Sequence, residues 1–318
     1  MSTISSEFLE KLLKSDKRTV ARAITYVESD DDLSEELLKA LHHNLGRAYK
    51  IGLTGPPGAG KSTITNQLTK ALVSEGKKVA IIAVDPTSPF TGGALLGDRV
   101  RMSEVGNSEN VFIRSMATRG SLGGLSKKTI DAADVLDAAG YDYILFETVG
   151  VGQSELDIAQ TADTTIVVLV PESGDSIQAM KAGLMEIADF FVINKSDRPG
   201  AEQAVSALQT ILMMRPHDVT SWLPSILKTV ASENRGIKEI IEEINKHHKY
   251  LLDTNNFLAK REEQLKIRIK DIIEHKLFDK IWNEKRTGII NNSVSKVISG
   301  ELSPYKLADE VVNDFYKN

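Results

Sequence analysis

The 318-residue sequence contains no cysteine. Disulfide bonds, thiolate metal sites and cysteine nucleophiles are therefore excluded for this chain. Long hydrophobic runs are also absent, because strongly apolar stretches such as IVVLV are far shorter than the ~20 residues that cross a bilayer. The first residues, MSTISSEFLEKLLKSDKR, lack the apolar core of a secretory signal. We therefore expect a cytoplasmic protein with no membrane partner.

The chain has no surplus of positive charge either. Its net charge is −5, which gives no indication of general binding to nucleic acid or to an anionic surface. Hydrophobic residues make up 41% and charged residues 26%, values that are typical of soluble globular proteins. We therefore expect no nucleic-acid partner, and the length suffices for one large domain with extensions.

Seven short apolar runs, most of them separated by helical patterns, define the middle of the chain. The runs are YKIGLTG, KVAIIAVD, NVFIRSM, YDYILFET, TTIVVLVP, DFFVINK and PSILKTVA. Near-continuous apolar strands that alternate with helices predict an α/β fold, a doubly wound and mostly parallel sheet with both faces covered. We expect this domain to span residues 47–250, after an N-terminal helical extension over residues 1–46.

The last part of the sequence, residues 251–318, is predicted to be a separate helical region. It follows the polar stretch NKHHKYLLDTNN, and Gly288, Gly300 and Pro304 are expected to divide it into about three helices. An apolar stripe recurs at helical spacing, made by Leu265, Ile269, Ile272 and Ile273 and continued by Phe278, Ile281 and Trp282. Such a stripe needs a covering surface, which could be the chain's own domain or a second copy.

The stretch GPPGAGKST, Gly55 to Thr63, matches the phosphate-loop pattern Gly-x4-Gly-Lys-Ser and lies between an apolar strand and a helical stretch. Glycines let backbone N–H groups turn toward a phosphate, Lys61 would contact the β- and γ-phosphates, and Ser62 would offer its hydroxyl to Mg²⁺. The other interpretation is a glycine-rich turn without a ligand. The predicted nucleotide-binding residues here are Gly55, Pro56, Pro57, Gly58, Ala59, Gly60, Lys61, Ser62 and Thr63.

A second motif, NKSD, follows the apolar strand DFFVI and matches the guanine-reading pattern Asn-Lys-x-Asp. Asp197 would accept hydrogen bonds from guanine N1–H and the exocyclic amine, whereas adenine would leave the carboxylate without partners. Asn194 and Lys195 would brace the loop and cover the base. In TVASEN, Ala231 is placed to back the guanine. Taken alone, the four residues of NKSD could be an ordinary turn.

Acidic residues end or follow two other strands. Asp85 ends the second apolar run, where ligands of α/β sheets collect, although Asp85-Pro86 could also simply start a turn. In ETVGVGQSE, Glu147 is the second-to-last residue of the fourth run. Val151 stands where many GTPases carry a glutamine that orients the attacking water. Val151 cannot orient water. Either Gln153 reaches the γ-phosphate, or Val151 only packs and Asp85 or Asp98 positions the water; Asp98 could equally be a solvated charge.

Together, five stretches resemble the GTPases associated with methylmalonyl-CoA mutase. They are GPPGAGKST, VDPTSPFTGGALLGDRVRM, RGSLGGLS, ETVGVGQSE and NKSD, and the resemblance spans nearly the whole chain. Some members of this family carry the name arginine/ornithine transport-system ATPase or kinase. The family belongs to the class of P-loop GTPases that includes the signal-recognition-particle and nickel-insertion GTPases. The resemblance implies a P-loop NTPase sheet that binds GTP, GDP and Mg²⁺.

The resemblance also assigns roles to individual positions. The implied metal site comprises Ser62, Asp85, Asp98 and Glu147, and the implied catalytic set comprises Lys61, Asp85, Asp98 and Glu147. The segment Pro171 to Gly183 matches a nucleotide-responsive loop that faces the partner, with Glu172, Asp175, Gln178 and Lys181 as its polar groups. The C-terminal helices are implied to form a homodimer.

The function that we expect is a GTP-hydrolysing chaperone that gates adenosylcobalamin loading and protection of an acyl-CoA mutase. Hydrolysis should be slow without the partner, since missing partner-supplied groups cost about 10³–10⁵ in rate. One rival is a metal-insertion GTPase, but the pairs His42-His43 and His247-His248 lie in polar segments and are expected to be solvated. Another rival is a kinase or ATPase of an amino-acid transport system, for which no acceptor site is evident.

Overall fold

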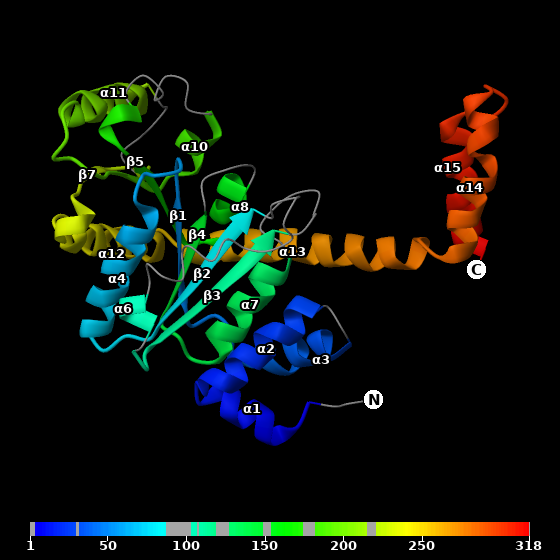
Figure 1. Ribbon diagram of the computed structural model, residues 1–318, viewed down its shortest axis with the longest axis horizontal. Helices are drawn as coiled ribbons and strands as arrows, with labels where there is room; N and C mark the ends of the chain where they lie inside the picture. The colour runs from blue at the N-terminus through cyan, green and yellow to red at the C-terminus, as the bar shows by residue number, and fades with distance from the viewer. Residues whose placement is uncertain are drawn as a thin grey trace. The chain divides into compact units, whose positions relative to one another are not determined.

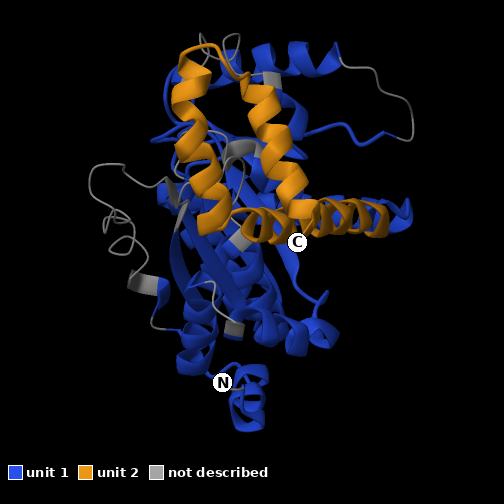
Figure 2. Cartoon of the chain, turned by 90° about the vertical axis from the view of Figure 1, so that its right-hand side faces the viewer, with its two compact units in different colours: residues 1–257 blue, residues 258–318 orange. Residues whose placement is uncertain are grey.

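The computed structural model describes residues 4–29, 32–86, 103–106, 108–118, 127–148, 154–173, 182–214 and 221–317. The chain forms two compact units, Met1–Phe257 and Leu258–Asn318 (Figure 2). Within the described residues, no helix is both long enough and apolar enough to cross a membrane.

A seven-stranded sheet forms the centre of the first unit. The strands are β1 (Tyr49–Thr54), β2 (Val79–Pro86), β3 (Val111–Thr118), β4 (Tyr143–Thr148), β5 (Thr164–Leu169), β6 (Phe190–Ile193) and β7 (Ile226–Lys228). Their order is β3-β2-β4-β1-β5-β6-β7, and every pairing is parallel (Figure 1). Each of the seven apolar runs is thus a strand, and the predicted doubly wound parallel α/β fold is confirmed.

The strand order places β1 at a topological switch point. β1 pairs with β4 on one side and β5 on the other, so the later strands extend the sheet in both directions from it. In open α/β sheets, ligands bind outside the carboxyl ends of the strands at such a point. The segment GPPGAGK leaves the carboxyl end of β1 and leads into α4 (Lys61–Ser74), which is where this rule locates a site.

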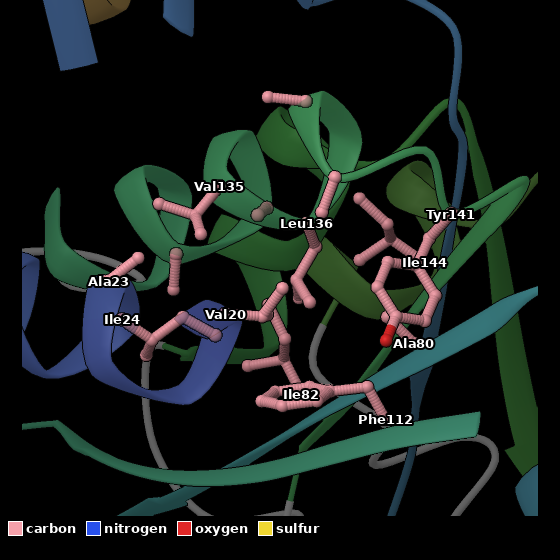
Figure 3. Close-up of a cluster of buried hydrophobic side chains, with 14 of the residues drawn as sticks. Val20, Ala23, Ile24, Ala80, Ile82, Phe112, Val135, Leu136, Tyr141 and Ile144 are labelled. Atoms are coloured by element: carbon pink, nitrogen blue, oxygen red, sulfur yellow. The ribbon is translucent and has the colours of Figure 1, made fainter. Parts of the chain in front are cut away.

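Helices cover both faces of the sheet because alternate residues of its strands point to opposite sides. On β2, Ala80 and Ile82 belong to one buried cluster, whereas Val79 and Ile81 belong to the other. The first cluster packs under α2 (Lys17–Ser29), α3 (Asp32–Leu41) and α7 (Lys127–Ala138). Figure 3 shows Ile82 and Phe112 of the sheet below Val20 and Ile24 of α2 and Val135 and Leu136 of α7.

The second face carries α4 and α12 (Ile237–Asp253), with the short α6 (Ser103–Gly106) beside α4. The remaining elements of this unit are α1 (Ser6–Leu13), η1 (His42–Asn44), α8 (Ser154–Thr161), η2 (Pro171–Ser173), α10 (Ala182–Ile187), α11 (Ala201–Met213) and η3 (Ala231–Glu233). α10 and α11 contribute Met185, Ala204, Leu208 and Leu212 to a third buried cluster with residues of β5 and β6.

The predicted N-terminal helical extension is tied to the sheet by a buried carboxylate. Asp137 of α7 accepts hydrogen bonds from the backbone N–H groups of Gly46 (2.7 Å), Arg47 (3.0 Å) and Ala48 (2.9 Å). Its side chain is buried, so these three donors stabilise the carboxylate where water cannot. The contact fixes the chain just before β1, and α1–α3 belong to the same compact unit as the sheet.

His247 corrects one prediction from the sequence. The stretch around it continues α12, and His247 is 2% exposed rather than solvated. Its Nδ1 lies 2.7 Å from Thr164 Oγ1, and its Nε2 lies 3.3 Å from Asp189 Oδ1. The polar residue type gave no indication of burial, because the two partners come from β5 and from Asp189, the residue before β6. His42 and His43 are exposed, as expected.

The second unit consists of helices. α13 (Asn256–Ile281) runs into it from the first unit, and α14 (Glu284–Ile298) and α15 (Pro304–Lys317) follow. The predicted break at Gly288 is wrong, because Gly288 lies inside α14. The break falls at Asn283, whose side chain caps α14 by accepting from Arg286 N at 2.9 Å.

Arg286 holds the second unit together. Its side chain is buried, donates to Asp314 Oδ2 of α15 at 3.0 Å, and donates to the carbonyls of Lys280 and Ile281 at 3.0 Å each. It therefore joins the end of α13 to α15.

Many large apolar side chains on these helices are exposed in the single chain, among them Leu265, Ile269, Ile273, Phe278, Trp282 and Ile298.

Candidate nucleotide-binding site

The backbone of the loop after β1 adopts conformations that are unfavourable for residues other than glycine. Gly55, Gly58 and Gly60 have φ angles of +134°, +74° and +90°. A Cβ on Gly55 would overlap the carbonyl oxygen of Val168, and a Cβ on Gly60 would overlap Nδ2 of Asn194. A Cβ on Gly58 would meet no atom within 4 Å. Gly55 and Gly60 are therefore required by close packing as well as by conformation.

Lys61 lies at the start of α4 and is 5% exposed. Its ammonium donates to the loop's own carbonyls, Gly55 O at 2.7 Å and Pro56 O at 3.0 Å. The charge is thus held over the loop and beside the N-terminus of α4, which favours anions. Ala59 is fully buried, whereas Pro57, Gly58 and Thr63 are exposed.

Ser62 contacts Glu147 directly, through a hydrogen bond from Ser62 Oγ to Glu147 Oε1. Glu147 lies near the end of β4, level with Leu53 of β1 and Ala83 of β2, and is 5% exposed. A hydroxyl and a buried carboxylate in contact are hard oxygen donors of the kind that Mg²⁺ prefers. The residues present therefore fit a magnesium site.

The other two residues of the predicted metal site are less defined. Asp85 is the second-to-last residue of β2, level with Ala117 of β3, so it lies at the same edge of the sheet as Glu147. Asp98 lies outside the described residues. The same holds for Val151 and Gln153, so the question of which residue orients the water stays a prediction. Across the residues that the structure describes, no group of three or more His, Asp or Glu is arranged to hold a metal ion.

Asn194 is the central contact between the two motifs. It follows β6, is 3% exposed, and donates from Nδ2 to Ala59 O at 2.8 Å. Its Oδ1 accepts from Thr229 Oγ1 and Ala231 N, each at 3.1 Å. One buried amide therefore joins the phosphate loop, the NKSD turn and the TVASEN loop. The structure brings together three segments that the sequence analysis identified separately.

Lys195 reinforces the same junction. It adopts a left-handed conformation with φ +56°, and its ammonium donates to Gly58 O at 2.8 Å. The following Ser196 N donates to Thr229 O at 3.0 Å. Asp197 is exposed in this turn, and Ala231 of η3, which donates its N–H to Asn194, is 1% exposed. Asp197 is thus free of burial, as a ligand-facing carboxylate would be.

The described residues include only the first part of the predicted partner-coupling loop. Glu172 lies in η2 and forms an ion pair with Arg198, 2.5 Å from Nη1 to Oε1. Asp175, Gln178 and Lys181 lie outside the described residues. Arg198 was not among the residues predicted from the sequence, although its position next to NKSD was a signal. It also gave Thr229 no role, although Thr229 begins the TVASEN loop.

The sheet order, the loop after β1 and the helix that follows define the chain as a P-loop NTPase. The family model described as "Methylmalonyl Co-A mutase-associated GTPase MeaB" matches residues 20–286. The chain therefore belongs to this family of GTPases, and guanine-nucleotide binding follows from the membership.

Two relatives and one solved structure illustrate the similarity. A putative GTPase of Pyrococcus abyssi is 46% identical over 310 residues, covering 97% of this chain and 96% of the relative. The mouse protein named methylmalonic aciduria type A homolog, mitochondrial, is 35% identical and covers 96% of this chain and 78% of its own length. A crystal structure of an LAO/AO transport system kinase covers 100% of both chains with 29% identity and a TM-score of 0.73.

Proposed function

We propose that this protein is a GTP-hydrolysing chaperone that gates adenosylcobalamin loading and protection of an acyl-CoA mutase of the methylmalonyl-CoA type. The observation that carries the proposal is the family match over residues 20–286, which includes the phosphate loop and the guanine motif. The name of the mouse relative, a methylmalonic aciduria protein, supports the same assignment.

The chain's own residues would bind and orient GTP. Backbone N–H groups of residues 55–62 would surround the phosphates, and Lys61 would exchange its contacts with Gly55 O and Pro56 O for phosphate oxygens. Asp197 would read the guanine edge, while Asn194 keeps the base loop and the phosphate loop in register.

Magnesium fits the pair Ser62 and Glu147, with Asp85 and Asp98 as the proposed remaining oxygen ligands. When bound, Mg²⁺ would neutralise charge that develops on the phosphates. The Ser62–Glu147 hydrogen bond links α4 to the end of β4. Ser62 would give up this bond in order to offer its hydroxyl to Mg²⁺. The chain alone should turn over slowly, because Val151 offers no group to orient water.

We also propose that the protein is a homodimer through its C-terminal helices. In the single chain, Ile298 is 82% exposed, Tyr305 85% and Tyr316 80%. Single exposed apolar side chains are normal on a protein surface, but here they recur along three helices, which is typical of an interaction surface. A second copy would cover them.

The test measures GTP turnover with and without a purified adenosylcobalamin-dependent mutase from the same organism. We expect methylmalonyl-CoA mutase to accelerate hydrolysis at least tenfold, since partner-supplied groups typically give far more. Lys61→Ala in the same mixture is the control for contaminating GTPase. A parallel arm with isobutyryl-CoA mutase identifies which mutase is served. Absence of both acceleration and complex formation, in GDP and in a non-hydrolysable GTP analogue, would refute the proposal.

A kinase is a second candidate because of the name of the similar crystal structure. The same assay separates the two functions when GTP is labelled at the γ-phosphate. A hydrolase releases all the label as inorganic phosphate. Label that appears on a protein side chain would favour the kinase.

A further inference from the structure

Glu172 lies against the turn that carries Asp197, although 25 residues separate the two in the sequence. The Arg198 guanidinium donates to the Glu172 carboxylate at 2.5 Å. This hydrogen bond holds the pKa of Glu172 below its usual value, and Lys195 also contributes. Glu172 is therefore an anion paired with Arg198, a cation of the turn that carries Asp197.

The backbone around this ion pair is held as well. Pro171 is buried, and it lies beside Gly200, where an added Cβ would be in ordinary contact with Pro171 Cβ at 3.8 Å. Residues 171–173 and the start of α11 thus pack together independently of the charges. The ion pair acts on segments that are already neighbours, so little chain entropy is lost when it forms.

The two halves of the turn are held in different ways. Asn194 fixes the first half through buried hydrogen bonds to Ala59, Thr229 and Ala231. In the second half, Arg198 N donates to Lys195 O at 3.0 Å and the Arg198 side chain reaches Glu172. Asp197 lies between these two anchors.

We propose that Glu172 is a positioning residue for guanine recognition, which fixes the orientation of Asp197 by holding Arg198. The inference rests on the proposed role of Asp197 as the reader of the guanine amine. It assigns to Glu172 a role in base selection, in addition to the coupling role expected from its loop.

The direction in which nucleotide affinity changes when Glu172 is removed distinguishes a positioning role from a purely electrostatic effect of its charge. Deleting a carboxylate near a polyanionic nucleotide should strengthen binding of every nucleotide by a similar factor. Loosening Asp197 should instead weaken guanine nucleotides most, because the exocyclic amine contributes only when its acceptor is in place. Inosine lacks this amine, so the ratio of GDP to IDP affinity reports the position of Asp197.

The experiment measures GDP and IDP affinities of the full-length protein by calorimetry. Glu172→Ala and Arg198→Ala are each expected to lower the GDP/IDP affinity ratio by about two- to fivefold, the range of exposed ion pairs. The double variant should lose no more than either single variant. The charge-reversed protein, Glu172→Arg with Arg198→Glu, should recover at least part of the ratio.

Glu202→Ala is the matched control. Glu202 forms an exposed ion pair with Lys228 at 2.6 Å, at the start of α11, and takes no part in the turn. It should leave the ratio unchanged. Equal changes for GDP and IDP in Glu172→Ala, in either direction, would overturn the positioning role while leaving the guanine assignment intact. A native protein that binds GDP no better than IDP and ADP would overturn both.

Discussion

The contact between Gly60 and Asn194 can be tested by comparing two glycines of one loop. Gly58 and Gly60 both have positive φ angles, +74° and +90°, so alanine at either position pays a similar conformational cost. They differ in surroundings. A Cβ on Gly58 meets nothing within 4 Å, whereas a Cβ on Gly60 overlaps the Asn194 amide. Gly58→Ala is therefore a matched control for Gly60→Ala.

The magnitudes follow from this difference. The left-handed conformation costs an alanine about 1–2 kcal/mol, which both variants lose. Gly60→Ala must also displace Asn194, whose amide makes buried hydrogen bonds to Ala59, Thr229 and Ala231. Each bond contributes about 0.5–1.5 kcal/mol, so partial loss of the three adds about 1–3 kcal/mol. We expect Gly60→Ala to be less stable than Gly58→Ala by that amount.

The assay measures the free energy of unfolding of the nucleotide-free protein by urea titration. The double variant Gly60→Ala with Asn194→Ala is a further control, because truncating Asn194 removes the amide that a Cβ on Gly60 would overlap. In that background, the additional cost of Gly60→Ala should fall to the cost seen for Gly58→Ala. If Gly58→Ala and Gly60→Ala lose equal free energy of unfolding, the contact between the phosphate loop and Asn194 does not contribute to stability.

Four further predictions test the remaining parts of the proposed site. Lys61→Ala should lower GTP turnover at least ~10²-fold in a phosphate-release assay, whereas the native protein alone should stay below about 1 s⁻¹; a faster native rate would show that Val151 is no handicap. Asp197→Asn should shift the preference from GDP toward XDP in competition binding, because the xanthine 2-oxo group accepts where the guanine amine donates; unchanged GDP preference would contradict the assignment. Light scattering at micromolar concentration should give twice the chain mass of 34.9 kDa, and a monomer would refute the proposed dimer. Asp175→Ala and Lys181→Ala, in the segment outside the described residues, should preserve intrinsic hydrolysis but reduce acceleration by the mutase, and full acceleration in both would show that this loop does not couple.

The fold was predictable from the sequence because its signals are local. The inner strands β1, β4, β5 and β6 are apolar runs that are buried along almost their whole length, and the loop between β1 and α4 carries a long motif. Gly288 shows where local signals fail. Glycine is a weak helix former, at a cost of about 1 kcal/mol, and here the capping side chain of Asn283 and the contacts of Arg286 decide the boundary instead.

The site was predictable in its parts but not in its connections. GPPGAGKS and NKSD each indicate a ligand, yet neither indicates that Asn194 packs on Gly60, since the pair is 134 residues apart. The burial of His247 has the same origin, because its partners Thr164 and Asp189 are far from α12 in the sequence. Contacts between distant segments depend on the order of strands in the sheet, which short sequence patterns do not encode.

Three polar side chains of the proposed site are already engaged within the protein. Lys61 contacts Gly55 O and Pro56 O, Lys195 contacts Gly58 O, and Ser62 contacts Glu147. Nucleotide binding would therefore exchange protein contacts for ligand contacts, and only the difference between them adds to affinity. The exchange at Ser62 would act beyond the loop, because its present partner Glu147 lies near the end of β4, four positions before Val151 in the sequence. Releasing Glu147 would make the carboxyl end of β4 respond to the phosphate site, and under the proposed function this would give the protein a physical means to report its nucleotide state to the mutase.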